Sequence, residues 1–236
     1  MKTKNTANSQ LTVQTLDFLR DLGQNNNREW FHANRSRYEA AKSEFEGLVG
    51  RLLNGIERFQ PLPNTNVKDC IFRINRDIRF SKDKAPYKKH FAAAVGPGGR
   101  HSGRVDYYFH VQPDGETFLG AGMWQPTPAH LAKFRQEIDY NVDELRGIIE
   151  APEFKAYFPE ISGESMKTSP KGYSADHPEI ALLRRKELFF IHRYSDQEVV
   201  KPDFADELVK GCQLIKPYCD YLNYLFYEEQ DETVAL

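Results

Sequence analysis

The segment Ile71–Lys89 contains the residues of this sequence best suited to chemistry, because seven of its side chains are Arg or Lys and two are Asp. The basic members are Arg73, Arg76, Arg79, Lys82, Lys84, Lys88 and Lys89. Arginine forks suit two-point recognition of phosphate or carboxylate groups, and lysine adds a flexible point charge. This segment, called the basic segment below, predicts a ligand site for an anion, built from Arg73, Arg76, Arg79, Lys82, Lys84 and Lys88.

The acidic residues of the basic segment support a structural interpretation, to which the sequence gives as much weight as to an anion site. Asp77 and Asp83 lie among the arginines, so the segment is also compatible with an Arg–Asp network that ends in a solvated loop. The same two carboxylates are candidates for proton transfer if the site is catalytic. Arg76 interrupts an apolar alternation, and an unpaired buried guanidinium is not tolerable. We therefore expect a carboxylate partner for Arg76 from elsewhere in the chain, with Glu29 and Asp176 as candidates.

The charge of the chain is unevenly distributed. The whole chain has a formal net charge of −2 and an isoelectric point near 6.4. Residues 68–104 hold ten Lys or Arg and three Asp, a local charge of +7, so the remainder carries −9. The overall balance argues against indiscriminate binding of polyanions, whereas the local excess permits an anion site.

Two further groups of residues are candidates for function. Asp176 and His177 are adjacent, and they could act as a catalytic base and the group that orients it, with helix capping as the alternative. Four aromatic residues could form a wall for a sugar or a base, with core packing as the alternative. These aromatic residues are Trp30, Tyr87, Trp124 and Tyr173.

The sequence predicts no metal site and no cofactor. The histidines and the three cysteines show no metal-ligand spacing. The Gly-rich stretch 96–103 lies between predicted strands, which is wrong for a dinucleotide or phosphate loop, so we expect a flexible hairpin loop there. The sparse, odd cysteine count fits a reducing compartment, and no apolar run is long enough for a membrane span. We expect a cytoplasmic protein without a membrane partner.

Hydrophobic periodicity predicts an α+β fold with a mostly antiparallel sheet, packed against long N- and C-terminal helices. The expected helices are Leu11–Leu22, Tyr38–Ile56, Pro128–Ile138, Val142–Ile149, Pro178–Arg185 and Asp203–Tyr227, and Asn26 with Glu29 resembles a capping box. The expected strands are Ile71–Arg76, His90–Gly96, Val105–Gln112, Thr117–Trp124 and Glu187–Tyr194. A hairpin at 105–124 turns through Pro113-Asp114-Gly115. We expect a disordered tail at 1–10, a single domain at 11–228 and an acidic tail at 229–236.

Four stretches of the chain carry a resemblance to a known family. They are Asn25–Phe31, Phe72–Lys88, Phe118–Pro126 and Pro170–Pro178. In these stretches the chain resembles the uncharacterised bacterial family called domain-of-unknown-function family 2461. The resemblance implies a shared fold and a bacterial origin, but it brings no assigned reaction. The sequence departs from the family pattern at Thr168-Ser169, where a further basic residue is often found beside Lys167.

Three functional interpretations remain open at this point. The first is an enzyme or binding protein for a small anionic or phosphorylated ligand. The second is a nucleic-acid-binding module that uses the same basic segment and nearby rings. The third is a structural or partner-binding protein in which the Arg–Asp residues stabilise the fold. The sequence does not decide whether the protein is an enzyme, and it does not predict an oligomeric state.

Overall fold

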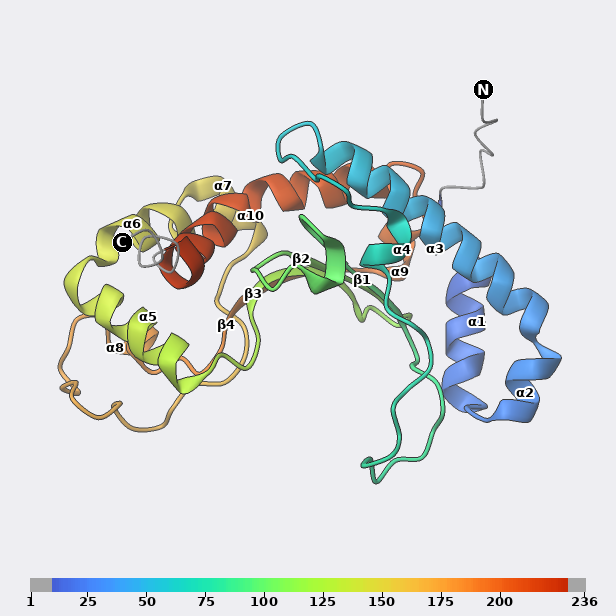
Figure 1. Ribbon diagram of the computed structural model, residues 1–236, viewed down its shortest axis with the longest axis horizontal. Helices are drawn as coiled ribbons and strands as arrows, with labels where there is room; N and C mark the ends of the chain where they lie inside the picture. The colour runs from blue at the N-terminus through green and yellow to red at the C-terminus, as the bar shows by residue number, and fades with distance from the viewer. Residues whose placement is uncertain (1–9, 229–236) are drawn as a thin grey trace, which may run out of the picture. The chain divides into compact units, whose positions relative to one another are not determined.

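The computed structural model describes residues 10–228, so the tail expected at 1–10, apart from Gln10, and the acidic tail expected at 229–236 lie outside the described residues (Figure 1). The helices are α1 (Val13–Gln24), α2 (Arg28–Ala33), α3 (Arg35–Ile56), α4 (Val67–Cys70), α5 (Pro128–Tyr140), α6 (Val142–Ile149), α7 (Pro152–Tyr157), α8 (Ile180–Leu183), α9 (Asp196–Val199) and α10 (Phe204–Tyr227). The strands are β1 (Phe91–Val95), β2 (Tyr107–Val111), β3 (Thr117–Met123) and β4 (Leu188–Tyr194). They form one antiparallel sheet in the order β1-β2-β3-β4, which confirms the α+β prediction.

The chain forms two compact units. Unit 1 contains the residues up to Gly103, together with Tyr107–Leu119 and Arg193–Lys210. Unit 2 contains Arg104–Asp106, Gly120–His192 and the residues from Gly211 onward. The expectation of a single domain at 11–228 stays a prediction. Strands β3 and β4 and helix α10 each contribute residues to both units.

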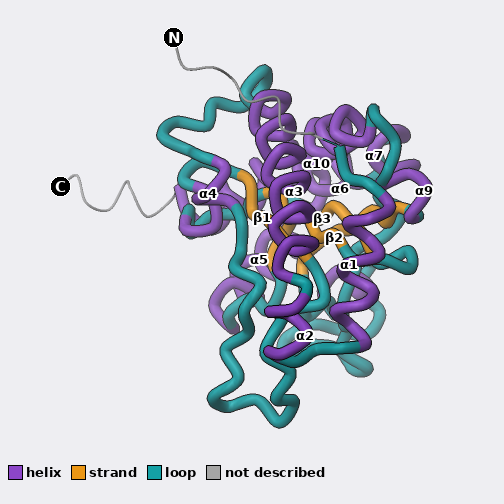
Figure 2. Tube along the Cα trace, turned by 90° about the vertical axis from the view of Figure 1, so that its right-hand side faces the viewer, coloured by secondary structure: helices purple, strands orange, loops and turns teal. Residues whose placement is uncertain are grey.

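In unit 1, helix α3 covers one face of β1 and β2 (Figures 1 and 2). The contact is aromatic: the ring of Phe45 stacks at 5.3 Å from Phe91 and at 6.0 Å from Phe109. All three side chains are buried. The long N-terminal helix of the prediction is therefore confirmed as a packing partner of the sheet, and its apolar stripe supplies the core of unit 1.

The hairpin between β2 and β3 forms where the sequence predicts it. Asp114 and Gly115 take positive φ angles of 66° and 75°, which a tight turn requires. The backbone N–H groups of both residues donate to the carboxylate of Asp196, at 3.0 Å each. These two hydrogen bonds hold the turn against the first residue of α9.

In unit 2, the C-terminal part of α10 packs closely against residues of β4. The buried Tyr218 donates its hydroxyl proton to the backbone oxygen of Leu188 at 3.2 Å, and its ring meets Phe190 edge-on. Gly122 in β3 has a φ of 126°, and a Cβ atom there would lie 2.2 Å from the same oxygen of Leu188. Only glycine fits at this position, because both the backbone angle and the space exclude a side chain.

The predicted strand Ile71–Arg76 is wrong, although the segment does run beside β1. It makes isolated bridges, Ile71 with Ala93 and Asn75 with Tyr87, rather than a continuous ladder. The chain then leaves the sheet as a long loop before it returns to β1 (Figure 1). The clustered charges favour a loop over a regular strand, because Arg76 gains partners within the loop that a strand would not provide.

The Gly-rich stretch is also more ordered than expected, since it contains a short 3-10 helix, η1 (Gly99–His101). The guanidinium of Arg100 donates to the backbone oxygens of Lys68 and Asp69, at 2.6 and 2.9 Å. A Cβ atom on Gly99 would lie 2.6 Å from the oxygen of Asp69, so the close approach depends on glycine. Among the described residues, no helix is long and apolar enough to cross a membrane.

Candidate functional site

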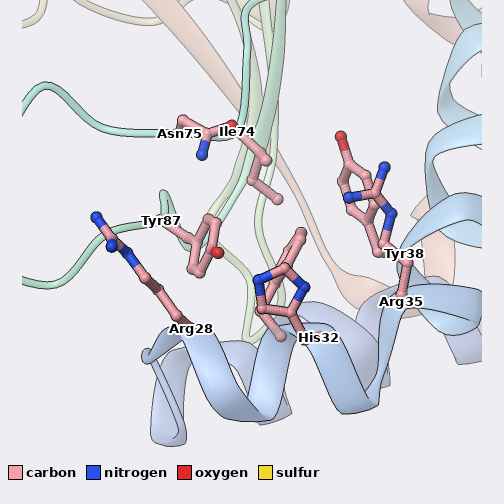
Figure 3. A pocket seen from close by; sticks show the side chains of 8 residues that line it. Arg28, His32, Arg35, Tyr38, Ile74, Asn75 and Tyr87 are labelled. Carbon is pink, nitrogen blue, oxygen red and sulfur yellow. The ribbon is translucent and has the colours of Figure 1, made fainter.

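An open pocket of about 460 Å³ in unit 1 is the best candidate for a binding site. It lies between the helical segment α2–α3 and the two arms of the basic segment (Figure 3). Its lining residues are Arg28, Phe31, His32, Arg35, Tyr38, Ile74, Asn75 and Tyr87.

The helical side of the pocket is basic. Arg28 and His32 lie four residues apart in α2, Arg35 is the first residue of α3, and all three line the pocket. Arg35 pairs with Glu39 at 2.6 Å. Within the described part of the chain, the side chains of Arg28 and His32 have neither an ion-pair nor a hydrogen-bond partner. Their donors are therefore available to a ligand.

The floor of the pocket is aromatic and fixed in place. The rings of Phe31 and Tyr87 stack at 4.0 Å with an angle of 16° between their planes, and both side chains are buried. Tyr38 packs against Phe31 at 4.9 Å, and burial raises the pKa of its hydroxyl. Asn26 holds the backbone of Tyr87 with two hydrogen bonds, from Nδ2 to the oxygen at 2.9 Å and from the N–H to Oδ1 at 3.0 Å.

This use of Asn26 corrects the expected capping box. Asn27 caps α2 instead, because its side chain accepts the N–H of Trp30 at 2.9 Å. Asn26 is thereby left to join the helical side of the pocket to the basic segment. The segment itself contributes Ile74 and Asn75 to the opposite wall (Figure 3).

The chemical character of this pocket is that of an anion receptor. Two guanidinium groups and an imidazole supply charge or hydrogen-bond donors, and the exposed amide of Asn75 adds a neutral donor and acceptor. The aromatic floor suits an apolar or planar part of a ligand. No cysteine, serine or unpaired carboxylate lines the pocket. Among the described residues, no group of three or more His, Cys, Asp or Glu could hold a metal ion.

Of the residues expected to bind a ligand, Tyr87 is the one that lines this pocket. Arg76 is paired, as predicted, but its partner is Asp83 at 2.6 Å rather than Glu29 or Asp176. Its guanidinium also donates to the backbone oxygen of Ala85 at 3.0 Å. Asp83 accepts the N–H of Ala85, and this bond together with Arg76 lowers the pKa of the Asp83 carboxyl.

The other arginine of the loop is engaged in a similar way. Arg79 bonds Asp77 at 2.7 and 3.0 Å, and this hydrogen bonding lowers the pKa of the Asp77 carboxyl. The guanidinium is nevertheless 76% exposed. Lys84 donates to the backbone oxygen of Ile78 at 3.0 Å, and Lys82 is exposed. These contacts give the loop tip an internal Arg–Asp network, and ligand binding or catalysis by its residues stays a prediction.

The remaining cations of the basic segment lie on its sheet side. The ammonium group of Lys88 lies 5.2 Å from the centre of the Phe72 ring. Burial, and then the charge of Arg73, lowers the pKa of Lys88. Neither Arg73 nor Lys88 lines the pocket, so their role as ligand contacts also stays a prediction.

Trp30 and Tyr173 have ring partners nearby, whereas Trp124 is largely exposed. In unit 1, Trp30 stacks on Phe18 at 6.1 Å. In unit 2, Trp124 is 69% exposed, and Tyr173 meets the ring of His177 edge-on at 6.3 Å. A wall made of Trp30, Tyr87, Trp124 and Tyr173 stays a prediction.

The carboxylate partner of His177 is Asp139, at 3.0 Å, rather than the neighbouring Asp176. Nδ1 of His177 accepts the N–H of Glu179 at 3.0 Å, so Nε2 carries the proton and donates it to Asp139. Both ring nitrogens are thus occupied just before α8, whose N-cap residue is Glu179, and a catalytic role for Asp176 and His177 stays a prediction.

Fold and site together define an α+β protein with a four-stranded antiparallel sheet and a basic, aromatic-floored pocket beside it. Residues 14–221 match the family described as Conserved hypothetical protein (DUF2461), and the chain belongs to that family. No curated protein and no solved structure matches the chain.

Proposed function

We propose that the pocket binds a small anionic ligand through Arg28, His32 and Arg35. The observation that carries the proposal is the position of Arg28 and His32. Both side chains line the pocket, and neither has an ion-pair or hydrogen-bond partner among the described residues. Guanidinium groups bind carboxylate or phosphate in a forked geometry, and their charge persists at every physiological pH. The volume of about 460 Å³ suits a ligand the size of a sugar phosphate or a nucleotide.

The lining favours binding over catalysis. Among the described residues that line the pocket, His32 is the one histidine, and none is a carboxylate or thiol that could share a proton transfer with it. The proposal therefore moves the anion site of the sequence prediction from the loop tip to the base of the basic segment. We also propose a cytoplasmic location, which the buried free thiols of Cys70, Cys212 and Cys219 support.

Isothermal titration calorimetry tests the proposal with inorganic phosphate, citrate, glucose 6-phosphate and AMP. We expect at least one of these anions to bind the wild-type protein, and the Arg28→Gln variant to bind it at least about tenfold more weakly, because a charge-assisted bond is lost. Arg58→Gln is the matched control, since Arg58 is exposed and does not line the pocket. It should bind like the wild type.

A second pair of variants separates the pocket from the loop tip. The double variant Arg79→Ala, Lys82→Ala removes two cations that do not line the pocket. If this variant loses binding while Arg28→Gln retains it, the anion site lies on the loop and the proposal is wrong. If none of the four anions binds at millimolar concentration, the structural interpretation of the basic residues is the better one.

A further inference from the structure

Five rings on a sheet surface of unit 1 form a second feature that the pocket does not explain. We call this surface the sheet platform, and it consists of Phe72, His90, Tyr108, His110 and Phe118. The rings come from the basic segment, from the residue before β1 and from strands β2 and β3. Elements far apart in the chain therefore supply one aromatic surface.

The rings of the sheet platform are in continuous contact. His110 lies at the centre: its ring is 4.0 Å from His90 and 4.8 Å from Phe118, and the latter pair is stacked with an interplanar angle of 12°. Tyr108 lies 5.8 Å from Phe118 and 6.1 Å from Phe72. Such spacings are typical of stacked and tilted aromatic pairs.

The sheet platform lies on the opposite side of the sheet from α3. Side chains alternate along β2: Tyr107, Phe109 and Val111 are buried, whereas Tyr108 and His110 are only half-buried. The buried set belongs to the side covered by α3, as the contact between Phe109 and Phe45 shows. The rings of the platform therefore keep part of their surface accessible to solvent.

The two histidines behave as uncharged rings at neutral pH. Burial, together with smaller contributions from the neighbouring His110 and Lys88, lowers the pKa of His90 to about 3. Burial also lowers the pKa of His110. The histidines of the platform are thus uncharged in the physiological pH range, and its charge comes from the residues at its borders.

Cations flank the sheet platform at both ends. Lys88 lies over the ring of Phe72 at 5.2 Å, and Arg193 lies over the ring of Phe118 at 5.9 Å. Arg193 forms an ion pair with Glu116 at 2.6 Å. Arg73, which acts on the pKa of Lys88, has no ion-pair partner among the described residues. The uncompensated positive charge therefore lies at the Phe72 end.

We infer that the sheet platform binds single-stranded nucleic acid, with bases on its rings and phosphates near Lys88 and Arg73. Bases have flat faces that stack on aromatic side chains, and the linking phosphates require nearby cations, which an apolar protein partner does not. A paired duplex hides the faces of its bases, so the platform predicts selectivity for single strands. The overall charge of the chain restricts binding to this local basic surface.

Fluorescence anisotropy tests the inference with fluorescein-labelled oligothymidylate and oligouridylate of about 20 nucleotides. We expect wild-type protein to bind at least one of them, with affinity that falls as salt rises and with weaker binding to the duplex. Tyr108→Leu keeps an apolar side chain but removes a ring, and it should weaken binding at least about fivefold. Tyr140→Leu is the matched control, because Tyr140 is 80% exposed on α5 and outside the platform.

Lys88→Gln provides an independent variant if Tyr108→Leu lowers the melting temperature. It should weaken binding and reduce its salt dependence. The pocket variant Arg28→Gln should bind oligonucleotides like the wild type, so failure of this inference is distinguishable from failure of the proposed function. The inference is wrong if neither oligonucleotide binds, if duplex binds as well as single strands, or if Tyr108→Leu and Lys88→Gln both bind like Tyr140→Leu.

Discussion

His90 should make the stability of this protein fall steeply in mild acid. Its pKa lies near 3 in the folded protein, compared with an ordinary value of 6.5. Above pH 6.5 the imidazole is neutral in both the folded and the unfolded protein, so it contributes no pH dependence. Between pH 6.5 and about 3 the unfolded chain binds a proton that the folded protein excludes, and stability falls as the pH falls.

The size of the effect follows from the two pKa values. At pH 5, the difference in proton binding corresponds to about 2 kcal/mol of lost stability. Because the ring is only half-buried, solvent screening reduces the expected loss to about 1–2 kcal/mol. His110 contributes in the same direction, since burial lowers its pKa too.

The assay is urea denaturation at pH 8, 7, 6 and 5 for three proteins. His90→Phe keeps a ring on the sheet platform but removes the titration, so its stability should fall by about 1–2 kcal/mol less than that of the wild type between pH 8 and 5. His101→Phe replaces an exposed histidine of η1 and is the matched control. If wild type and His90→Phe show parallel pH profiles, the burial argument for His90 is refuted.

Three further outcomes test the packing described above. Asn26→Ala should lower the free energy of unfolding by about 1–3 kcal/mol, measured by urea denaturation, because two hydrogen bonds to the pocket floor are lost. Gly122→Ala should be more destabilising than Gly115→Ala: both glycines have positive φ, but a Cβ atom on Gly115 meets nothing within 4 Å. A similar melting temperature for the two glycine variants would contradict the steric argument. Arg79→Ala should leave the denaturation midpoint unchanged, since its ion pair is exposed.

The elements that could be predicted from sequence are those with local determinants. The β2–β3 hairpin follows from alternation on both sides of Pro113-Asp114-Gly115, and α3 follows from its apolar spacing. The strand predicted at Ile71–Arg76 failed because alternation also occurs in a segment whose cations find partners in their own loop. Arg76 pairs with Asp83, seven residues away, and hydrophobic periodicity does not predict that ion pair.

The pocket could be predicted only in part, because it is a tertiary feature. Arg28, His32 and Arg35 follow one another at spacings of four and three residues, and this spacing is a signal in the sequence for a shared basic surface. What the spacing cannot show is that Asn75 and Tyr87 lie opposite them, since those residues are at least forty positions away in the chain. The sequence predicts a helix-capping role for Asn26, whereas in the structure its side chain makes two hydrogen bonds to the backbone of Tyr87.

The irregular path of the basic segment also bears on self-association. Strand β1 ends the sheet, and a bare terminal strand offers unpaired backbone groups to another copy of the chain. Here the segment covers β1 with scattered backbone bonds, such as the one from the Phe72 N–H to the Ala92 oxygen at 2.9 Å, and the neighbouring Arg73 is exposed. A second chain would meet a charged, interrupted border instead of a flat template. Departure from ideal strand geometry at 71–76 therefore acts as protection against edge-to-edge aggregation.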